Sequence, residues 1–124
     1  MPTVLIVEDH QFNRDLLERR LQRAGCRVIS LAEGSQVLAT VAREHPDLII
    51  MDVRLPDIDG LELTRRLKAD ERLRRIPVAI LTASVREEDS RLASAAGCDA
   101  FLTKPFEWAD LWPKLQALLP PSVP

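Results

Sequence analysis

Four short, uninterrupted apolar runs constrain the fold of this chain more than any other feature of its sequence. They cover residues 4–7, 48–51, 78–81 and, more weakly, 100–102. Strands buried on both faces of a parallel sheet are continuously apolar, whereas half-exposed strands alternate apolar and polar residues. We therefore predict four buried parallel strands, and a fifth, half-buried strand at residues 27–31.

Segments with the spacing of amphipathic helices separate these strands. Their apolar residues repeat at helical intervals, at Leu17 and Leu21; Val37, Leu38 and Val41; Leu63 and Leu67; Leu92, Ala95 and Ala96; and Leu111, Leu115, Leu118 and Leu119. Gly25, Gly97 and the pair His45-Pro46 are typical residues for helix ends. Strand and helix alternate five times, which predicts a single doubly wound α/β domain with helices on both faces of the sheet.

Pro113 interrupts the last of these helical patterns. Inside a helix it would remove a backbone hydrogen bond and clash with the preceding turn. We expect the helix to begin late, with Asp110 as its N-cap, because Pro113 then lies in the first turn, where amides lack partners anyway. The alternative is a kinked helix that starts near Glu107.

Composition excludes several classes of protein. The 124 residues are 46% hydrophobic and 29% charged, as in a globular domain, and the net charge of −2 gives no sign of a nucleic-acid surface. No run approaches the ~20 apolar residues of a membrane span, and residues 1–30 lack a signal-peptide pattern, so we expect a cytoplasmic protein. Cys26 and Cys98 are not spaced like zinc ligands, and we interpret both as small buried hydrophobic residues.

Polar residues whose side chains can bind metals or take part in catalysis follow the predicted strands. Glu8 and Asp9 follow the first strand and Asp52 follows the third. In a parallel sheet of strand order 2-1-3-4-5 these two strands are neighbours at the switch point, where ligands bind. The three carboxylates are therefore expected to share one pocket, with Thr82 and Lys104 on its far wall.

A cluster of three carboxylates needs a cation, because like charges in one pocket repel each other. Oxygen ligands at this density suit a hard ion that keeps several waters, which indicates Mg²⁺ and not Zn²⁺. Mg²⁺ and the ammonium of Lys104 together balance the three negative charges. Such a pocket can accept an incoming phosphoryl group, whose charge the metal and the ammonium share.

Four segments, in order along the chain, resemble one known family. They are VLIVEDHQFNR, DLIIMDVRLPDIDG, IPVAILTAS and GCDAFLTKPF. Together they are similar to the receiver domain of bacterial response regulators, the CheY-like family, and the match covers nearly the whole chain. The resemblance implies the flavodoxin-like fold, with a receiver domain at residues 1–119 and a proline-rich tail at 120–124.

The resemblance also implies a role for each carboxylate. Asp52 is the nucleophile that takes a phosphoryl group from a phosphohistidine on a histidine kinase or a histidine phosphotransfer protein. Asp9 ligates Mg²⁺ directly and Glu8 largely through water, while the backbone carbonyl of Arg54 supplies a further oxygen. The domain is not expected to be an enzyme with a separate substrate, since it promotes only its own phosphorylation and dephosphorylation.

Residues on the far wall receive roles in the same way. Thr82 donates its hydroxyl to one phosphoryl oxygen and Lys104 its ammonium to another, and the bond between Lys104 and Pro105 is expected to be cis. Phe101 takes the position of a switching aromatic ring, which turns inward when Thr82 moves toward the phosphate. This changes the face made by the fourth helix, last strand and last helix, a candidate surface for partners or a homodimer.

Arg54, Ser84 and two tryptophans receive less specific roles. By resemblance, Arg54 and Ser84 line the path of the hydrolytic water and tune the lifetime of the phosphoaspartate. Trp108 and Trp112 lie four residues apart. If both indoles are exposed, they form an apolar patch for partner binding; otherwise Pro113 turns at least one of them inward.

The remaining polar residues near the pocket have structural interpretations. Asp59 is expected to be an N-cap in a capping box with Glu62, and Asp57 a solvated turn residue. His10 is interpreted as a loop residue at the rim of the pocket. The arginines of the first helix are interpreted as a solvated face, balanced by Asp15 and Glu18; they are Arg14, Arg19, Arg20 and Arg23.

Other functions are less consistent with the sequence. A Mg²⁺-dependent phosphatase or nuclease would need a second aspartate two residues after Asp52, where Arg54 stands. A nucleotide or flavin binder would need a glycine-rich loop, and the chain has four glycines in all. The alternative that we retain is a phosphorylation-independent interaction scaffold. We expect the signal to pass to a separate protein or, if the chain is a fragment, to a C-terminal output domain, without direct contact to nucleic acid or membrane.

Overall fold

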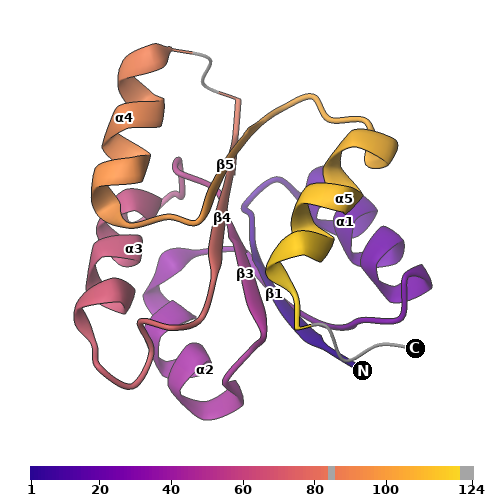
Figure 1. The fold of residues 1–124 in the computed structure, drawn as a ribbon, viewed down its shortest axis with the longest axis horizontal. Coiled ribbons are helices and arrows are strands. Elements are labelled where there is room, and N and C mark those ends of the chain that lie inside the picture. Colours follow the sequence, from indigo (N-terminus) through magenta and orange to yellow (C-terminus); the bar gives the residue numbers. More distant parts are fainter. Residues whose placement is uncertain (84–85, 121–124) are drawn as a thin grey trace.

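The computed structural model describes residues 1–83 and 86–120. Its centre is a parallel sheet with strand order β2-β1-β3-β4-β5, which confirms the predicted topology (Figure 1). The strands are β1 (Thr3–Val7), β2 (Arg27–Leu31), β3 (Leu48–Met51), β4 (Val78–Thr82) and β5 (Ala100–Thr103). Strand order reverses between β1 and β3, which are direct neighbours with Val7 beside Met51. The carboxyl ends of these two strands therefore lie together.

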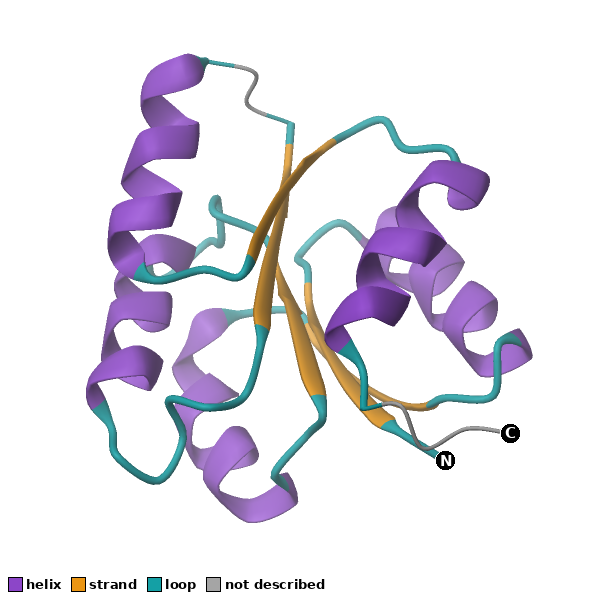
Figure 2. Cartoon of the chain, in the orientation of Figure 1, coloured by secondary structure: helices purple, strands orange, loops and turns teal. Residues whose placement is uncertain are grey.

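Helices cover both faces of the sheet, as predicted. They are α1 (Gln11–Arg23), α2 (Val37–Glu44), α3 (Gly60–Ala69), α4 (Glu87–Ala96) and α5 (Trp108–Leu118), with a short 3-10 helix, η1 (Gly34–Gln36), before α2. Figures 1 and 2 show α1 and α5 on one face and the other three α-helices on the opposite face. Within residues 1–83 and 86–120, every helix is too short or too polar to cross a bilayer.

Two apolar cores explain why the strands lack polar alternation. Leu5 and Val7 point into the core under α2, α3 and α4, while Val4 and Ile6 point into the core under α1 and α5. All four side chains are essentially inaccessible to solvent. Because both faces are covered, β1, β3 and β4 are apolar at every interior position, and polarity appears only where these strands end.

Helix α5 begins earlier than we predicted. It starts at Trp108 with Glu107 as its N-cap, so the late start after Asp110 is wrong and the alternative start near Glu107 is correct. The amides of Asp110 and Leu111 both donate to the carbonyl of Glu107, at 3.0 and 2.9 Å. Pro113 therefore lies inside the helix, where it lacks the amide that would donate to the carbonyl four residues earlier.

Stacked tryptophans supply a physical reason for the early start. The rings of Trp108 and Trp112 are parallel within 14°, with centroids 5.3 Å apart, which one helical turn makes possible. Both indoles are partly buried against the core under α1 and α5, and the guanidinium carbon of Arg20 lies 6.0 Å from the Trp108 ring centroid. These contacts offset the hydrogen bond lost at Pro113. Of the two alternatives, the structure favours indoles turned inward over an exposed patch.

The two cysteines are both free thiols. Cys26 is buried, as predicted, whereas Cys98 is only partly buried at the edge of the core under α2, α3 and α4. Burial raises the pKa of both thiols. Neither thiol is therefore activated as a nucleophile.

Asp57 is an exposed residue of the turn after β3, as we expected, and it also connects this turn to the start of η1. Its carboxylate accepts hydrogen bonds from the amides of Gly34 and Ser35, both at 2.8 Å, although the residue itself is exposed. These bonds join the loop after β3, which carries Asp52, to the start of η1. The hydrogen bond from Gly34, helped by that from Ser35, lowers the pKa of Asp57.

We predict that Asp57→Ala destabilises the domain in a pH-dependent way. The pKa of Asp57 in the folded state is below its ordinary value of about 3.8. The ionised carboxylate therefore contributes fully to stability above that ordinary pKa, and this contribution is lost as pH falls through the folded-state pKa. Urea unfolding should show a lower free energy of unfolding for the variant at pH 7, and this difference should narrow below about pH 3.8.

Asp57→Asn is the matched control for this experiment. The asparagine keeps an acceptor oxygen but cannot titrate. The difference in unfolding free energy between Asp57→Asn and Asp57→Ala should therefore not change with pH. If the difference in unfolding free energy between wild type and Asp57→Ala stays constant from pH 7 to pH 3, the ionised carboxylate of Asp57 does not stabilise the fold.

Candidate functional site

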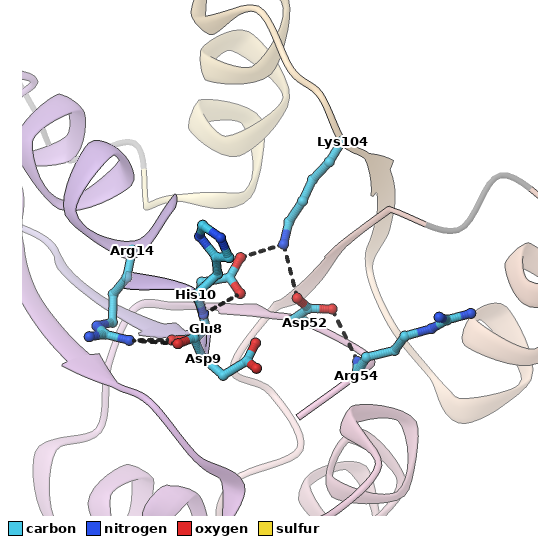
Figure 3. A network of polar contacts seen from close by, with 7 residues as sticks. All are labelled: Glu8, Asp9, His10, Arg14, Asp52, Arg54 and Lys104. Carbon is cyan, nitrogen blue, oxygen red and sulfur yellow. Dashed lines mark hydrogen bonds and ion pairs between the residues drawn. The ribbon is translucent and has the colours of Figure 1, made fainter. Parts of the chain in front are cut away.

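The carboxyl ends of β1 and β3 bring three carboxylates together, as the sequence predicted. Backbone hydrogen bonds extend each strand by one residue: the amide of Glu8 donates to Leu31 and that of Asp52 to Val7, both at 3.0 Å. Glu8, Asp9 and Asp52 can each supply one oxygen within 4.8 Å of the other two. Figure 3 shows Asp9 and Glu8 on one side of this cluster and Asp52 facing them.

The three carboxylates differ in their exposure. Glu8 and Asp52 are buried, with 3% and 8% of their surface accessible, whereas Asp9 is exposed. Burial raises the pKa of Glu8, and the nearby ammonium of Lys104 opposes that rise without cancelling it. The buried pair therefore requires a compensating cation, while Asp9 can reach a ligand from solvent.

Lys104 supplies a positive charge between the two buried carboxylates. It follows β5, and its ammonium donates to Glu8 Oε1 and, at 2.9 Å, to Asp52 Oδ2 (Figure 3). Burial by itself lowers the pKa of Lys104, but the hydrogen bonds to Glu8 and Asp52 raise it above its ordinary value. The peptide bond between Lys104 and Pro105 is cis, as we expected. Lys104 thus belongs to the site that we predicted from strand ends.

The loop after β3 holds Asp52 from the other side. Asp52 Oδ1 accepts a hydrogen bond from the backbone amide of Arg54 at 3.1 Å, so both carboxylate oxygens are oriented. Gly60 packs directly on this loop: a Cβ at this position would lie 2.1 Å from the carbonyl oxygen of Asp52. The Arg54 side chain is exposed and extends away from Asp52 (Figure 3). Two expectations for Arg54 stay predictions: that its backbone carbonyl ligates Mg²⁺, and that its side chain tunes the lifetime of the phosphoaspartate.

Asp59 is the N-cap of α3, as predicted. Its carboxylate accepts a hydrogen bond from the amide of Leu61 at 2.8 Å. The reciprocal half of a capping box does not form, because Glu62 pairs with Arg65 and Arg66 one turn further along the helix. Of Asp52, Asp57 and Asp59, only Asp52 belongs to the acidic cluster.

The predicted switch residues occupy the neighbouring strands. Thr82 is the buried last residue of β4, and its carbonyl accepts the amide of Lys104 at 2.8 Å. Phe101 lies in β5 beside Ile80 and is partly buried against the core under α2, α3 and α4. Ser84, the second tuning residue that we predicted, lies outside the described residues.

Arg14 is a site residue that our sequence reasoning missed. We had assigned it to a solvated helix face, but its Nη1 donates to the backbone carbonyl oxygens of Glu8 (2.9 Å) and Asp9 (3.3 Å). His10 is exposed at the rim, as expected, and its amide donates to Glu8 Oε2 at 3.2 Å. A contact to a backbone carbonyl has no characteristic residue pattern, and only the short distance in sequence between Arg14 and the acidic pair could have suggested it.

The donor set fits a divalent metal ion of the magnesium type. All three candidate side chains offer carboxylate oxygen, the ligand type that Mg²⁺ prefers. Three carboxylates facing one ammonium also leave a surplus of negative charge in the pocket. Glu8, Asp9 and Asp52 are therefore compatible with the metal site of a receiver domain.

Comparisons with known proteins agree with this geometry. The family model for the response regulator receiver domain matches residues 4–116. The polar-differentiation response regulator DivK of Brucella ovis is 40% identical over 103 residues, covering 83% of this chain and 84% of that protein. DivK of Brucella anthropi is 41% identical over 104 residues, with the same coverage.

Solved structures show the same fold. The chemotaxis response regulator CheY4 of Vibrio cholerae superposes with a TM-score of 0.89 at 31% identity, covering 96% of this chain and 99% of that one. The receiver domain of the sensor histidine kinase PA1611 of Pseudomonas aeruginosa, with a magnesium ion coordinated in its active site cleft, has a TM-score of 0.87 at 38% identity. It covers 94% of this chain and 96% of that one. The chain belongs to the response regulator receiver family, the CheY-like domains of two-component signalling.

Proposed function

We propose that this domain accepts a phosphoryl group on Asp52 from a phosphohistidine of a histidine kinase or a histidine phosphotransfer protein. The observation that carries the proposal is the cluster itself: Glu8, Asp9 and Asp52 lie together, and the ammonium of Lys104 bonds two of them. A carboxylate oriented through both oxygens, beside a cation, is suited to attack a phosphorus atom. The surplus negative charge of the cluster supports a requirement for Mg²⁺.

The reaction balances with these residues and one proton. An oxygen of Asp52 forms a bond to phosphorus, the bond between phosphorus and the donor imidazole nitrogen breaks, and that nitrogen takes a proton. Mg²⁺ held by Glu8, Asp9 and Asp52 would supply charge neutralisation for the transferred group. Lys104 already lies against Asp52, so its ammonium can pass from the carboxylate to a phosphoryl oxygen. Hydrolysis restores the free carboxylate of Asp52: a water oxygen forms a bond to phosphorus, the bond between phosphorus and Asp52 breaks, and inorganic phosphate and a proton are released.

Signalling would follow from a rearrangement at the neighbouring strands. Thr82 and Phe101 lie on β4 and β5, on the side of the cluster where Lys104 approaches. A hydroxyl of Thr82 drawn toward the phosphoryl group would free space for the Phe101 ring, which is now only partly buried. The α4-β5-α5 face would then contact a separate target, an output domain or a second copy of the chain. We place this activity in the cytoplasm.

The domain would act as a phosphoacceptor and not as an enzyme that turns over a separate substrate. The complete acidic cluster with its lysine also distinguishes this proposal from the phosphorylation-independent scaffold. A scaffold has no need to bury Glu8 and Asp52 around an ammonium, since burying charges costs free energy that a purely structural surface avoids.

Phosphorylation can be tested with a small acyl phosphate and intact-mass spectrometry. We expect wild type to gain one phosphoryl adduct in the presence of Mg²⁺, to gain none with a chelator, and to lose the adduct slowly with time. Asp52→Asn should gain none, because an amide oxygen is a far weaker nucleophile than a carboxylate.

Asp59→Asn is the matched control in the same segment. Asparagine is as good an N-cap as aspartate, so α3 should be preserved and the adduct should form normally. If Asp52→Asn still gains an adduct, or if folded wild type with Mg²⁺ bound gains none, Asp52 is not the phosphoacceptor.

Removal of Lys104 should destabilise the metal-free domain. Lys104→Met leaves the buried carboxylates of Glu8 and Asp52 without their cation, which should lower the free energy of unfolding by about 2–3 kcal/mol. Added Mg²⁺ should restore part of this loss in the variant, because it places another cation beside the same carboxylates. Urea unfolding with and without Mg²⁺ measures both effects.

Lys114→Met tests whether the loss is specific to the site. Lys114 is an exposed lysine of α5, so its replacement should change the unfolding free energy by no more than about 0.5 kcal/mol. Equal losses in the two variants, or no rescue of Lys104→Met by Mg²⁺, would show that Lys104 does not balance the charge of the acidic cluster.

A further inference from the structure

Arg14 connects α1 to the loop that carries two of the acidic residues. From the second turn of the helix its Nη1 reaches back to the backbone carbonyls of Glu8 and Asp9, at 2.9 and 3.3 Å. The side chain is partly buried along this path. Figure 3 shows the guanidinium on one side of the loop and the carboxylates of Glu8, Asp9 and Asp52 on the other.

The N-cap of α1 contributes no side-chain hydrogen bond that would fix this loop. His10 is the N-cap but makes no side-chain cap hydrogen bond, and the first turn of the helix contains no acidic residue. A side-chain cap commonly orients the chain that enters a helix. In α1 the two hydrogen bonds of Arg14 orient that chain instead, because they turn successive carbonyls toward the helix.

Loop geometry decides where the acidic side chains point. The amide of His10 donates to Glu8 Oε2 at 3.2 Å, so the position of the loop backbone and the position of the Glu8 carboxylate depend on each other. Asp9 is exposed, and its carboxylate makes no hydrogen bond to residues 1–83 or 86–120, so only its backbone directs it toward the cluster. A change in the Glu8 and Asp9 carbonyls therefore moves two of the three candidate metal ligands.

We propose that Arg14 is a positioning residue for divalent-cation binding: its hydrogen bonds to the Glu8 and Asp9 carbonyls hold their carboxylates where a cation can bridge them to Asp52. The inference rests on the proposed function, since it concerns the same acidic cluster. It assigns to Arg14 no contact with the cation or with the phosphoryl group.

Replacement of Arg14 should change the affinity for a divalent cation in opposite directions, depending on whether Arg14 acts through its charge or by positioning the ligands. Arg14 is a cation beside a cation site, so by electrostatic repulsion alone its removal would tighten binding of a divalent ion. If Arg14 positions the ligands, its removal weakens binding instead, because the loop carbonyls lose their donor. The sign of the change in affinity therefore separates the two effects.

The experiment measures Mn²⁺ affinity by the electron paramagnetic resonance signal of the free ion, without any phosphodonor. Arg14→Met should weaken Mn²⁺ binding by about tenfold, as loss of a residue that orients metal ligands typically does. Arg14→Lys retains the charge and donor hydrogens on a shorter stem, and should fall between Arg14→Met and wild type. Arg19→Met is the matched control, because Arg19 is an exposed arginine of the same helix whose side chain makes no hydrogen bond to residues 1–83 or 86–120. The Mn²⁺ affinity of Arg19→Met should equal that of wild type.

A second measurement separates positioning from general loss of structure. Amide hydrogen exchange of His10 should become faster in metal-free Arg14→Met and stay unchanged in Arg19→Met, while amides of the central strands keep their protection in both. If Arg14→Met does not fold, Arg14→Lys carries the test, because a charge effect alone predicts no change in its affinity.

Each outcome has one meaning. Wild type that binds Mn²⁺, with Arg14→Met binding equally or more tightly, overturns the positioning role and leaves the proposed function intact. Folded wild type that does not bind Mn²⁺ at all overturns the proposed function, and with it the present inference.

Discussion

The structure of this site depends on one electrostatic arrangement, the ammonium of Lys104 between the carboxylates of Glu8 and Asp52. Two buried carboxylates at the ends of adjacent strands repel each other and lose their hydration. The lysine offsets both costs from the end of β5, which lies two positions from β3 and three from β1 in the sheet. Burying charged groups costs more free energy than burying neutral ones, so the charged cluster supports the proposed binding of a divalent cation and a phosphoryl group.

Local supports around the cluster are made mainly of contacts between side chains and the backbone. Arg14 holds two carbonyls of the loop after β1, Asp57 holds two amides at the start of η1, and the Arg54 amide holds Asp52. Gly60 lets α3 begin directly against the carbonyl of Asp52. These contacts restrain the loops after β1 and β3 and join the second of them to η1, which keeps the geometry of a site built on loops.

Helix α5 illustrates how tertiary packing overrides a local preference. Pro113 favours a late start, yet the helix begins five residues before it. Stacked Trp108 and Trp112, covered on one side by Arg20 of α1, gain contacts that a later start would forfeit. The same contacts join α5, part of the proposed output face, to α1, the helix that carries Arg14.

The sequence by itself determined the sheet, its order of elements and the acidic cluster, because burial on both faces imposes continuous apolar runs and leaves polarity to strand ends. It also indicated the N-cap at Asp59, whose signal is local. Only the tertiary structure decided the roles of Arg14 and Asp57 and the start of α5. Their partners are backbone atoms or rings brought near by folding, and a backbone carbonyl or amide is the same at every position, so no residue pattern marks it in advance.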